Sequence, residues 1–229
     1  MAASIPFFPS KTYCVLIGNG ECPSPDKHTH ILNNARCIIC ADGGANYAYR
    51  QNVKPDWILG DLDSIEPEVL EYYQRQYIPI QKLKSQRNND LEKALRKAIR
   101  LGYQQLILIG FIGKRIDQTL ATLQVAKKYV RKARIILYSS SYEIYPLVPG
   151  KYTFAAQPGD PVSIFGFPRA YGITTTGLQW SLTNNHLLEG SRGLSNLATN
   201  NFIKISFARG FLLLLIAPLG SEKARLNKE

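Results

Sequence analysis

Short, uninterrupted apolar runs alternate with longer amphipathic stretches through the first part of the chain. Apolar runs without polar alternation are typical of strands buried on both faces, whereas Leu91, Leu95 and Ala98 recur at helical spacing. The predicted strands are Tyr13–Ile17, Cys37–Ala41, Trp57–Leu59, Leu106–Ile109 and Arg134–Tyr138. The predicted helices are Asn46–Arg50, Pro67–Gln76, Asp90–Leu101 and Asp117–Tyr129. This order predicts an α/β domain with a mostly parallel, doubly wound sheet between two layers of helices.

The pattern changes after the serines Ser139-Ser140-Ser141, where we place a domain boundary. Short apolar segments now follow one another between Pro and Gly turns, without helical periodicity of useful length. The predicted strands are Tyr142–Val148, Tyr152–Ala155, Val162–Phe165, Ile203–Ala208 and Phe211–Ile216. We therefore expect an α/β domain over residues 1–139 and an all-β sandwich or partial barrel over residues 140–229.

The composition is that of a globular protein without a membrane or secretory segment. Its longest apolar run, Phe211–Ala217, is far shorter than the roughly 20 residues that a membrane helix needs. Met1–Ser10 lacks the cationic start and long apolar stretch of a signal peptide. Cys37–Cys40 has CxxC spacing, but the two isoleucines inside it favour a buried strand over a redox or zinc site. We expect a cytoplasmic protein with reduced thiols.

The formal net charge of +11, from 28 Lys and Arg against 17 Asp and Glu, attracts polyanions such as nucleic acid, anionic membrane or nucleotides. Much of this charge lies in Lys82–Arg100 and Lys127–Arg134, which fall largely on predicted amphipathic helices. Because a solvated helix face commonly carries such charge, the excess does not identify a partner by itself.

The loop Gly60-Asp61-Leu62-Asp63-Ser64 directly follows a predicted strand and carries the most specific chemistry. In an extended backbone, residues two apart point to the same side, so Asp61 and Asp63 are expected to face one spot. Two carboxylates this close raise each other's pKa unless a cation lies between them, and Mg²⁺ prefers oxygen ligands. The alternative is an exposed Asp-rich turn.

Three further loops lie where strands are predicted to end. Asp42-Gly43-Gly44-Ala45-Asn46 combines an acid with glycines, Lys84–Asp90 mixes cations with polar residues, and Gly110–Arg115 joins glycines to two cations before a helix. Glycines also make ordinary turns, and Asp90 or Asp117 also suits a helix start. Because open α/β sheets bind ligands outside the carboxyl ends of their strands, we expect the loops to converge on one phosphate-binding site.

These motifs resemble those of the thiamine pyrophosphokinase family over nearly the whole chain. Ala41–Asn46 is similar to that family's ADGGAN, Gly60–Ile65 to its GDFDSI, and Gly110–Gln118 to its G-x-x-G-G/K-R-x-D-H/Q segment. Thr174–Trp180 and Ser195-Asn196 resemble its thiamine-side motifs. The resemblance implies a homodimer that binds ATP and thiamine, and transfer of a pyrophosphoryl group from ATP to the thiamine hydroxyl with release of AMP. Such transfer depends on positioning and charge neutralisation.

The same resemblance implies a role for each matching residue. Asp61, Asp63 and Asp90 would hold Mg²⁺, while Asp42 and Arg115 would act at the reacting groups. The residues implied in nucleotide binding are Gly43, Asn46, Gly113, Lys114, Asp117, Gln118 and Arg87. Trp180 would stack on thiamine, with Ser195 and Asn196 hydrogen-bonded to it. The alternative for Trp180 is an ordinary core tryptophan.

The segment Ser85–Asp90 departs from the family's D-Q-D-x-T-D. Ser85 and Arg87 replace two carboxylates, although Arg87 suits phosphate oxygens. Because lost metal ligands weaken metal binding, a non-catalytic protein that binds thiamine, its diphosphate or a nucleotide stays an alternative to the enzyme. Transfer to another alcohol, such as a pterin, is disfavoured by the thiamine-side motifs, and nucleic-acid binding ranks last because only the charge suggests it.

Overall fold

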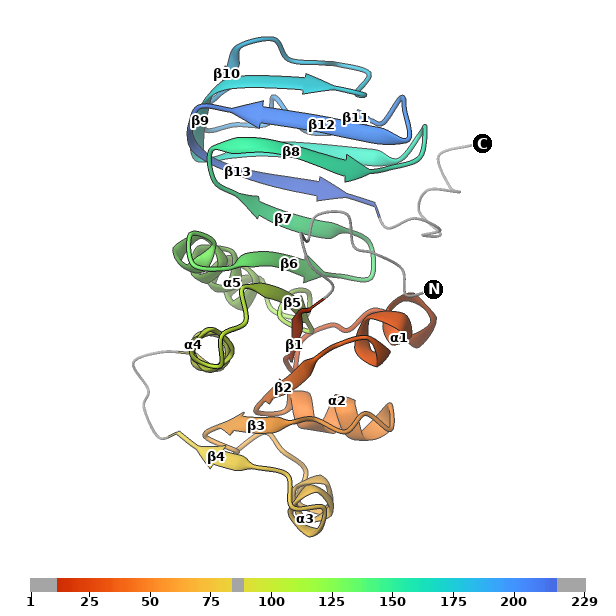
Figure 1. The fold of residues 1–229 in the computed structure, drawn as a ribbon, viewed down its shortest axis with the longest axis vertical. Coiled ribbons are helices and arrows are strands. Elements are labelled where there is room, and N and C mark those ends of the chain that lie inside the picture. Colours follow the sequence, from red (N-terminus) through yellow and green to blue (C-terminus); the bar gives the residue numbers. More distant parts are fainter. Residues whose placement is uncertain (1–11, 84–88, 218–229) are drawn as a thin grey trace. The chain divides into compact units, whose positions relative to one another are not determined.

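The computed structural model describes residues 12–83 and 89–217 (Figure 1). The described residues divide into two compact units, 12–140 and 141–217. Ser85 and Arg87, which replace the motif carboxylates, lie outside the described residues.

Six strands form the sheet of the N-terminal unit, and all of their described pairings are parallel. Their spatial order is β4-β3-β2-β1-β5-β6. The strands are β1 (Cys14–Ile17), β2 (Cys37–Ala41), β3 (Trp57–Gly60), β4 (Ile80–Lys82), β5 (Gln105–Ile109) and β6 (Arg134–Tyr138). All residues of β1, β2 and β5 are buried, as their unbroken apolar runs predict.

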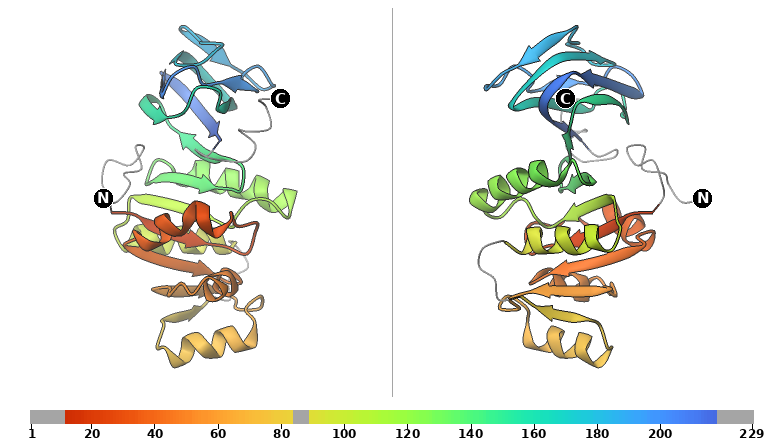
Figure 2. Two further views of the ribbon diagram at one scale, coloured as in Figure 1. Left: turned by 90° about the vertical axis from the view of Figure 1, so that its right-hand side faces the viewer. Right: turned by 60° about the vertical axis from the view of Figure 1, so that its left-hand side comes forward.

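Five helices connect these strands: α1 (Pro25–Asn33), α2 (Gly44–Arg50), α3 (Pro67–Arg75), α4 (Asp90–Arg100) and α5 (Ile116–Tyr129). Helix α4 packs against β1, β2 and β3, and α2 packs against β1 and β2. The views in Figures 1 and 2 place α4 and α5 on the face opposite α1 and α2, which follows if the crossovers are right-handed.

The strand order reverses at β1, which pairs with β2 on one side and β5 on the other. Helices α1 and α5, which follow β1 and β5, lie on opposite faces of the sheet, and ligands of open α/β sheets bind at such a reversal of strand order. The loops after β2 and β3 lie at the same edge of the sheet.

The C-terminal unit consists of antiparallel strands, and residues 141–217 contain no helix. The strands are β7 (Glu143–Leu147), β8 (Gly150–Ala155), β9 (Pro161–Thr176), β10 (Asn185–Leu187), β11 (Asn196–Leu197), β12 (Phe202–Phe207) and β13 (Arg209–Ile216). The long strand β9 pairs with β13 along residues 162–171 and with β12 along residues 174–176. A strand that changes partners in this way joins two sheet segments around one core, which agrees with the β-rich prediction. No helix within residues 12–83 and 89–217 is both long and apolar enough to cross a membrane.

Candidate functional site

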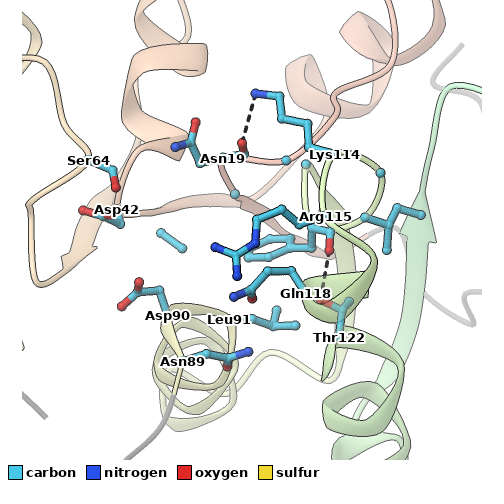
Figure 3. A pocket seen from close by; sticks show the side chains of 17 residues that line it. Asn19, Asp42, Ser64, Asn89, Asp90, Leu91, Lys114, Arg115, Gln118 and Thr122 are labelled. Carbon is cyan, nitrogen blue, oxygen red and sulfur yellow. Dashed lines mark hydrogen bonds between the residues drawn. The ribbon is translucent and has the colours of Figure 1, made fainter. Parts of the chain in front are cut away.

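A cavity of about 440 Å³ opens at the carboxyl ends of the parallel strands (Figure 3). Loops after β1, β2, β3 and β5 contribute to its wall, together with the first turns of α4 and α5. Its polar and charged side chains are Asn19, Asp42, Ser64, Asn89, Asp90, Lys114, Arg115, Gln118 and Thr122. The described parts of the predicted strand-end loops therefore meet at one site.

Hydrogen bonds hold the loops after β1 and β5 side by side along this cavity. The Gly18 amide donates to the Ile109 carbonyl at 2.8 Å, and the Glu21 amide donates to the Ile112 carbonyl at 3.1 Å. Gly110 has φ 75°, and a Cβ at this position would lie 2.5 Å from the Gly18 carbonyl oxygen. Only glycine allows the two backbones to approach this closely.

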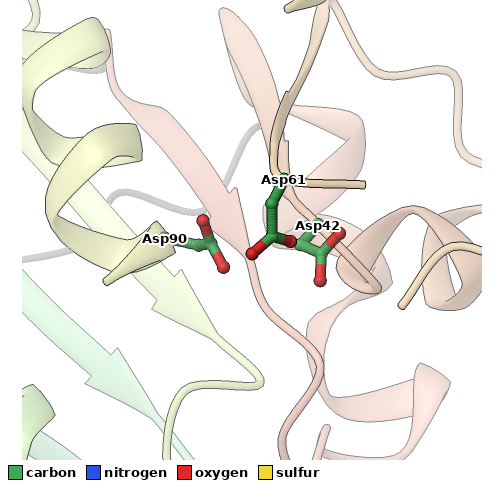
Figure 4. A group of neighbouring side chains, drawn as sticks. All are labelled: Asp42, Asp61 and Asp90. Atoms are coloured by element: carbon green, nitrogen blue, oxygen red, sulfur yellow. The ribbon is translucent and has the colours of Figure 1, made fainter. Parts of the chain in front are cut away.

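Three aspartates, Asp42, Asp61 and Asp90, form a carboxylate cluster beside the cavity. One oxygen of each lies within 4.8 Å of an oxygen of the other two, and Figure 4 shows the three side chains next to one another. Asp42 is 7% exposed, and its Oδ1 is buried without a hydrogen-bond partner. An orphaned oxygen within a group of acids is the arrangement that a hard cation such as Mg²⁺ satisfies.

Burial raises the pKa of Asp42 above its ordinary value, and the negative charges of Asp90 and Asp61 add to this effect. Polar contacts with Ser64 and with the Gly43 backbone offset only part of the increase. A divalent ion would reverse the balance, since a nearby positive charge favours the ionised carboxylate.

The backbone of strands β2 and β3 brings Asp42 and Asp61 together. The Asp42 amide donates to the Leu59 carbonyl at 2.9 Å, and Asp42 itself has φ 48°. A Cβ on Gly60 would lie 2.9 Å from the Asp42 Cβ, so glycine is required for this approach. Asp61 follows Gly60 directly and therefore emerges beside Asp42.

Asp63 does not join the carboxylate cluster. Leu62 adopts φ 67°, so the backbone here is not extended and the rule that residues two apart share a side does not apply. Asp63 is exposed and its Oδ1 accepts a hydrogen bond from the Ser64 hydroxyl at 3.0 Å. The expectation that Asp61 and Asp63 face one spot through an extended backbone is wrong, and Asp42 completes the cluster instead.

Asn46, predicted to bind nucleotide, anchors the acidic loop. It is 5% exposed, its Nδ2 donates to the Ser64 carbonyl at 2.9 Å, and its Oδ1 accepts from the Glu66 amide at 3.0 Å. Gly43 precedes helix α2 as its N-cap. Both residues position the loops rather than line the cavity.

Lys114 and Arg115 bring positive charge to the side of the cavity across from Asp42 and Asp90 (Figure 3). Lys114 Nζ donates to the Asn19 carbonyl at 3.3 Å. Arg115 donates to both carboxylate oxygens of Asp117 at 3.1 and 2.5 Å, and this contact lowers the pKa of Asp117. Gly113 and Gln118 line the cavity, whereas Asp117 does not and orients Arg115 instead.

Some polar residues that line the cavity, Asn19 and Thr122 among them, were not predicted from the sequence to lie there. Asn19 lies in Gly18-Asn19-Gly20, and two glycines directly after the first strand were the available signal. Thr122 carries no such signal, because its role depends on a tertiary contact in which its hydroxyl donates to the Phe111 carbonyl at 2.9 Å. The predicted phosphate contact of Arg87 lies outside the described residues.

In the C-terminal unit, Trp180 is 58% exposed, so the alternative of a core tryptophan is wrong. Buried Asn196 holds its backbone, because Asn196 Oδ1 accepts from the Trp180 amide at 3.1 Å and Asn196 Nδ2 donates to the Trp180 carbonyl at 2.8 Å. Ser195 is exposed with φ 58°, and its amide donates to the Ser163 hydroxyl at 3.2 Å. An aromatic face is thus offered to solvent on a fixed backbone.

Comparison with known families accounts for both units. Residues 28–138 match the family description "Thiamin pyrophosphokinase, catalytic domain", and residues 151–212 match "Thiamin pyrophosphokinase, vitamin B1 binding domain". The chain belongs to the thiamin pyrophosphokinase family. Its relatives include thiamine pyrophosphokinase 3 of Oryza sativa subsp. japonica, 31% identical over 223 residues that cover 84% of this chain and 79% of that protein.

Two further similarities extend over most of the chain. Thiamine pyrophosphokinase 1 of the same plant is 29% identical over 228 residues, which cover 86% of this chain and 84% of the relative. The crystal structure of thiamine pyrophosphokinase from Bacillus subtilis superposes with a TM-score of 0.79 at 21% identity, covering 90% of this chain and 98% of that one. At 21% identity, the similarity to the Bacillus subtilis structure supports the fold alone.

Proposed function

We propose that this chain is a thiamine pyrophosphokinase that transfers the pyrophosphoryl group of ATP to the hydroxyl of thiamine. Family membership supports the reaction, and the observation that carries it is the cavity with Asp42 and Asp90 on one side and Lys114 and Arg115 on the other. In the reaction, the thiamine oxygen bonds to the β-phosphorus, the bond from that phosphorus to the bridging oxygen of AMP breaks, and the hydroxyl proton is released.

The N-terminal unit would bind ATP with Mg²⁺. Asp42, Asp61 and Asp90 would hold the ion, and the buried Oδ1 of Asp42 supports this assignment. When bound, Mg²⁺ supplies positive charge that neutralises the polyphosphate. Asp63 would contribute through the loop that it shares with Asp61, since its own carboxylate lies outside the cluster.

Lys114 and Arg115 would contact phosphate oxygens and stabilise the charge that develops on the departing AMP. Arg115 is suited to this because Asp117 fixes its guanidinium at the wall of the cavity. Helix α5 begins directly after Arg115, and the positive end of its dipole favours an anion. Gly113 and Gln118 complete this side.

Trp180 would stack on a ring of thiamine, and its exposed face supports that assignment. Asn196 would act by holding the Trp180 backbone, while exposed Ser195 would hydrogen-bond the vitamin. We also propose a homodimer, which light scattering of the purified protein would test.

The decisive experiment measures AMP release and thiamine diphosphate with ATP and Mg²⁺, with and without thiamine. Thiamine-dependent formation of both products is expected, and Asp61→Asn should abolish it. A folded protein that forms neither product with millimolar Mg²⁺ or Mn²⁺ would refute the proposal. Product formed from a pterin and not from thiamine would refute the choice of acceptor.

The non-catalytic alternative is favoured by the replacement of two motif carboxylates with Ser85 and Arg87. It predicts calorimetric binding of thiamine or nucleotide without turnover. Replacing both residues with Asp should raise the activity if these substitutions impair an enzyme. Robust turnover by the unchanged chain excludes the alternative.

A further inference from the structure

Lys93 brings a buried positive charge to the edge of the carboxylate cluster. Its Nζ donates to Asp90 Oδ1 at 2.8 Å, and its side chain is only 9% exposed. The same Nζ lies 3.3 Å from the Leu83 carbonyl oxygen, to which it also donates. Lysine is seldom buried to this degree unless it is paired, so the contacts define a fixed position for the Lys93 ammonium.

The second contact links Lys93 to the opposite side of the cluster. The Leu83 amide donates to the Gly60 carbonyl at 2.7 Å, and Gly60 directly precedes Asp61. Lys93 therefore connects helix α4, which carries Asp90, to the strand end that carries Asp61. The Lys93 side chain therefore helps to fix the position of the Asp90 carboxylate relative to that of Asp61.

We infer that Lys93 is a positioning residue that fixes the Asp90 carboxylate for a divalent cation. With Oδ1 held by Lys93, the other oxygen of Asp90 is the one offered to the ion. Lys93 also offsets one of the three negative charges in the cluster, which leaves a net charge that matches a divalent ion. Partners that orient metal ligands typically contribute 10- to 100-fold to metal affinity.

The inference rests on the proposed function only through the cation site, so ion binding tests it directly. Mn²⁺ replaces Mg²⁺ because the paramagnetic resonance of free Mn²⁺ reports binding. The titration includes α,β-methylene-ATP, whose carbon bridge blocks pyrophosphoryl transfer. The variants are Lys93→Met and Asp90→Asn alone and combined. Lys97→Met is the matched control: Lys97 is on the same helix, but its Nζ lies 3.1 Å from the centroid of the Trp57 ring.

Lys93→Met should raise the Kd for Mn²⁺ about 10- to 100-fold, whereas Lys97→Met should leave it within about 3-fold of the wild type, as for a distant site. In the Asp90→Asn background, Lys93→Met should add little, because its effect acts through that carboxylate. With thiamine and ATP, the apparent KM for Mg²⁺ should rise while the KM for thiamine stays unchanged. If Lys93→Met does not fold, Lys93→Gln carries the same comparison.

The inference is overturned if Lys93→Met leaves the Kd for Mn²⁺ unchanged or lowers it. It is also overturned if Lys93→Met weakens Mn²⁺ binding equally in the wild-type and Asp90→Asn backgrounds. A lower melting temperature with unaltered Mn²⁺ affinity shows a purely structural role and overturns it too. Wild-type protein that binds Mn²⁺ but forms no thiamine diphosphate refutes the proposed reaction. In that case the Mn²⁺ dissociation constants of the variants still test the role of Lys93. Absence of Mn²⁺ binding to the wild type overturns both.

Discussion

Asp42→Asn is expected to stabilise the metal-free protein while removing its response to a divalent ion. The substitution keeps the shape of the side chain, and asparagine tolerates the left-handed backbone that Asp42 adopts at φ 48°. It removes a buried charge that faces Asp61 and Asp90, and it replaces an oxygen with an amide that donates hydrogen bonds. Two unfavourable terms of the native state are therefore relieved together.

The magnitude follows from the orphaned Oδ1 of Asp42, which is 7% exposed. A buried polar group without a partner costs about 1–3 kcal/mol, so we expect a gain of about 1–2 kcal/mol. For a chain of this size that gain corresponds to about 2–8 °C in melting temperature. A saturating divalent ion should make the wild type the more stable of the two proteins, because an ion at 100 times its Kd stabilises the wild type by about 2.7 kcal/mol.

The gain from Asp42→Asn should depend on pH. Because the pKa of Asp42 is raised in the fold, the native state binds its proton more tightly than the unfolded state does. The wild type therefore loses stability as the pH rises from about 4, the ordinary pKa of aspartate, through the raised value. The asparagine variant lacks this loss, so its advantage should grow as the pH rises through the raised pKa and should vanish below about pH 4.

Urea unfolding with EDTA and with saturating Mn²⁺, across this pH range, measures each of these differences. Asp63→Asn is the control, because Asp63 is exposed and outside the cluster; its effect should stay within about 0.5 kcal/mol and its Mn²⁺ response should persist. The reasoning is refuted if Asp42→Asn is less stable than the wild type in EDTA at neutral pH. It is equally refuted if Mn²⁺ stabilises both proteins to the same extent.

Three further outcomes test other parts of the structure. Glu92→Gln should destabilise the protein by about 1–3 kcal/mol in urea, because this 7% exposed carboxylate accepts hydrogen bonds from three side chains; Glu71→Gln, in an exposed ion pair, should change it by less than about 1 kcal/mol. Trp180→Ala should raise the KM for thiamine without changing the KM for ATP, whereas Phe202→Ala, at the same 58% exposure, should change neither. Gly60→Ala should weaken Mn²⁺ binding measured by paramagnetic resonance, because its Cβ would force two cluster loops apart; an unchanged affinity would contradict that geometry.

The elements that the sequence predicted correctly are those whose apolar pattern matches their burial. The apolar runs in β1, β2 and β5 are buried throughout, and such runs give a clear strand signal in the sequence. Helix α1 and strand β4 escaped prediction because α1 is rich in polar residues and β4 has three residues without full burial. Most of β9 was missed because its partly exposed positions blur the alternation.

The site was predictable at the level of loops but not of individual side chains. The strand-end motifs predicted that Asp42, Asp61 and Asp90 lie at one edge, and the parallel pairing places them there. Asp63 was misjudged because Leu62 takes a positive φ that residue types do not reveal. The role of Lys93 was not predicted from the sequence, because its position depends on contacts with Leu83 and Asp90 that only the folded structure shows.

The carboxylate cluster shows why this sheet needs strong packing elsewhere. Asp42 combines a positive φ, an orphaned oxygen and two acidic neighbours, each of which opposes folding in the absence of an ion. The opposing stability comes from strands β1, β2 and β5, whose buried Val, Leu and Ile side chains contribute about 1.5–3 kcal/mol each. Because these strands end directly at the site, their rigidity is transmitted to the loops that hold the acids. A fold that stabilised the acids internally, with more donors around Asp42, would leave less of their charge for an ion.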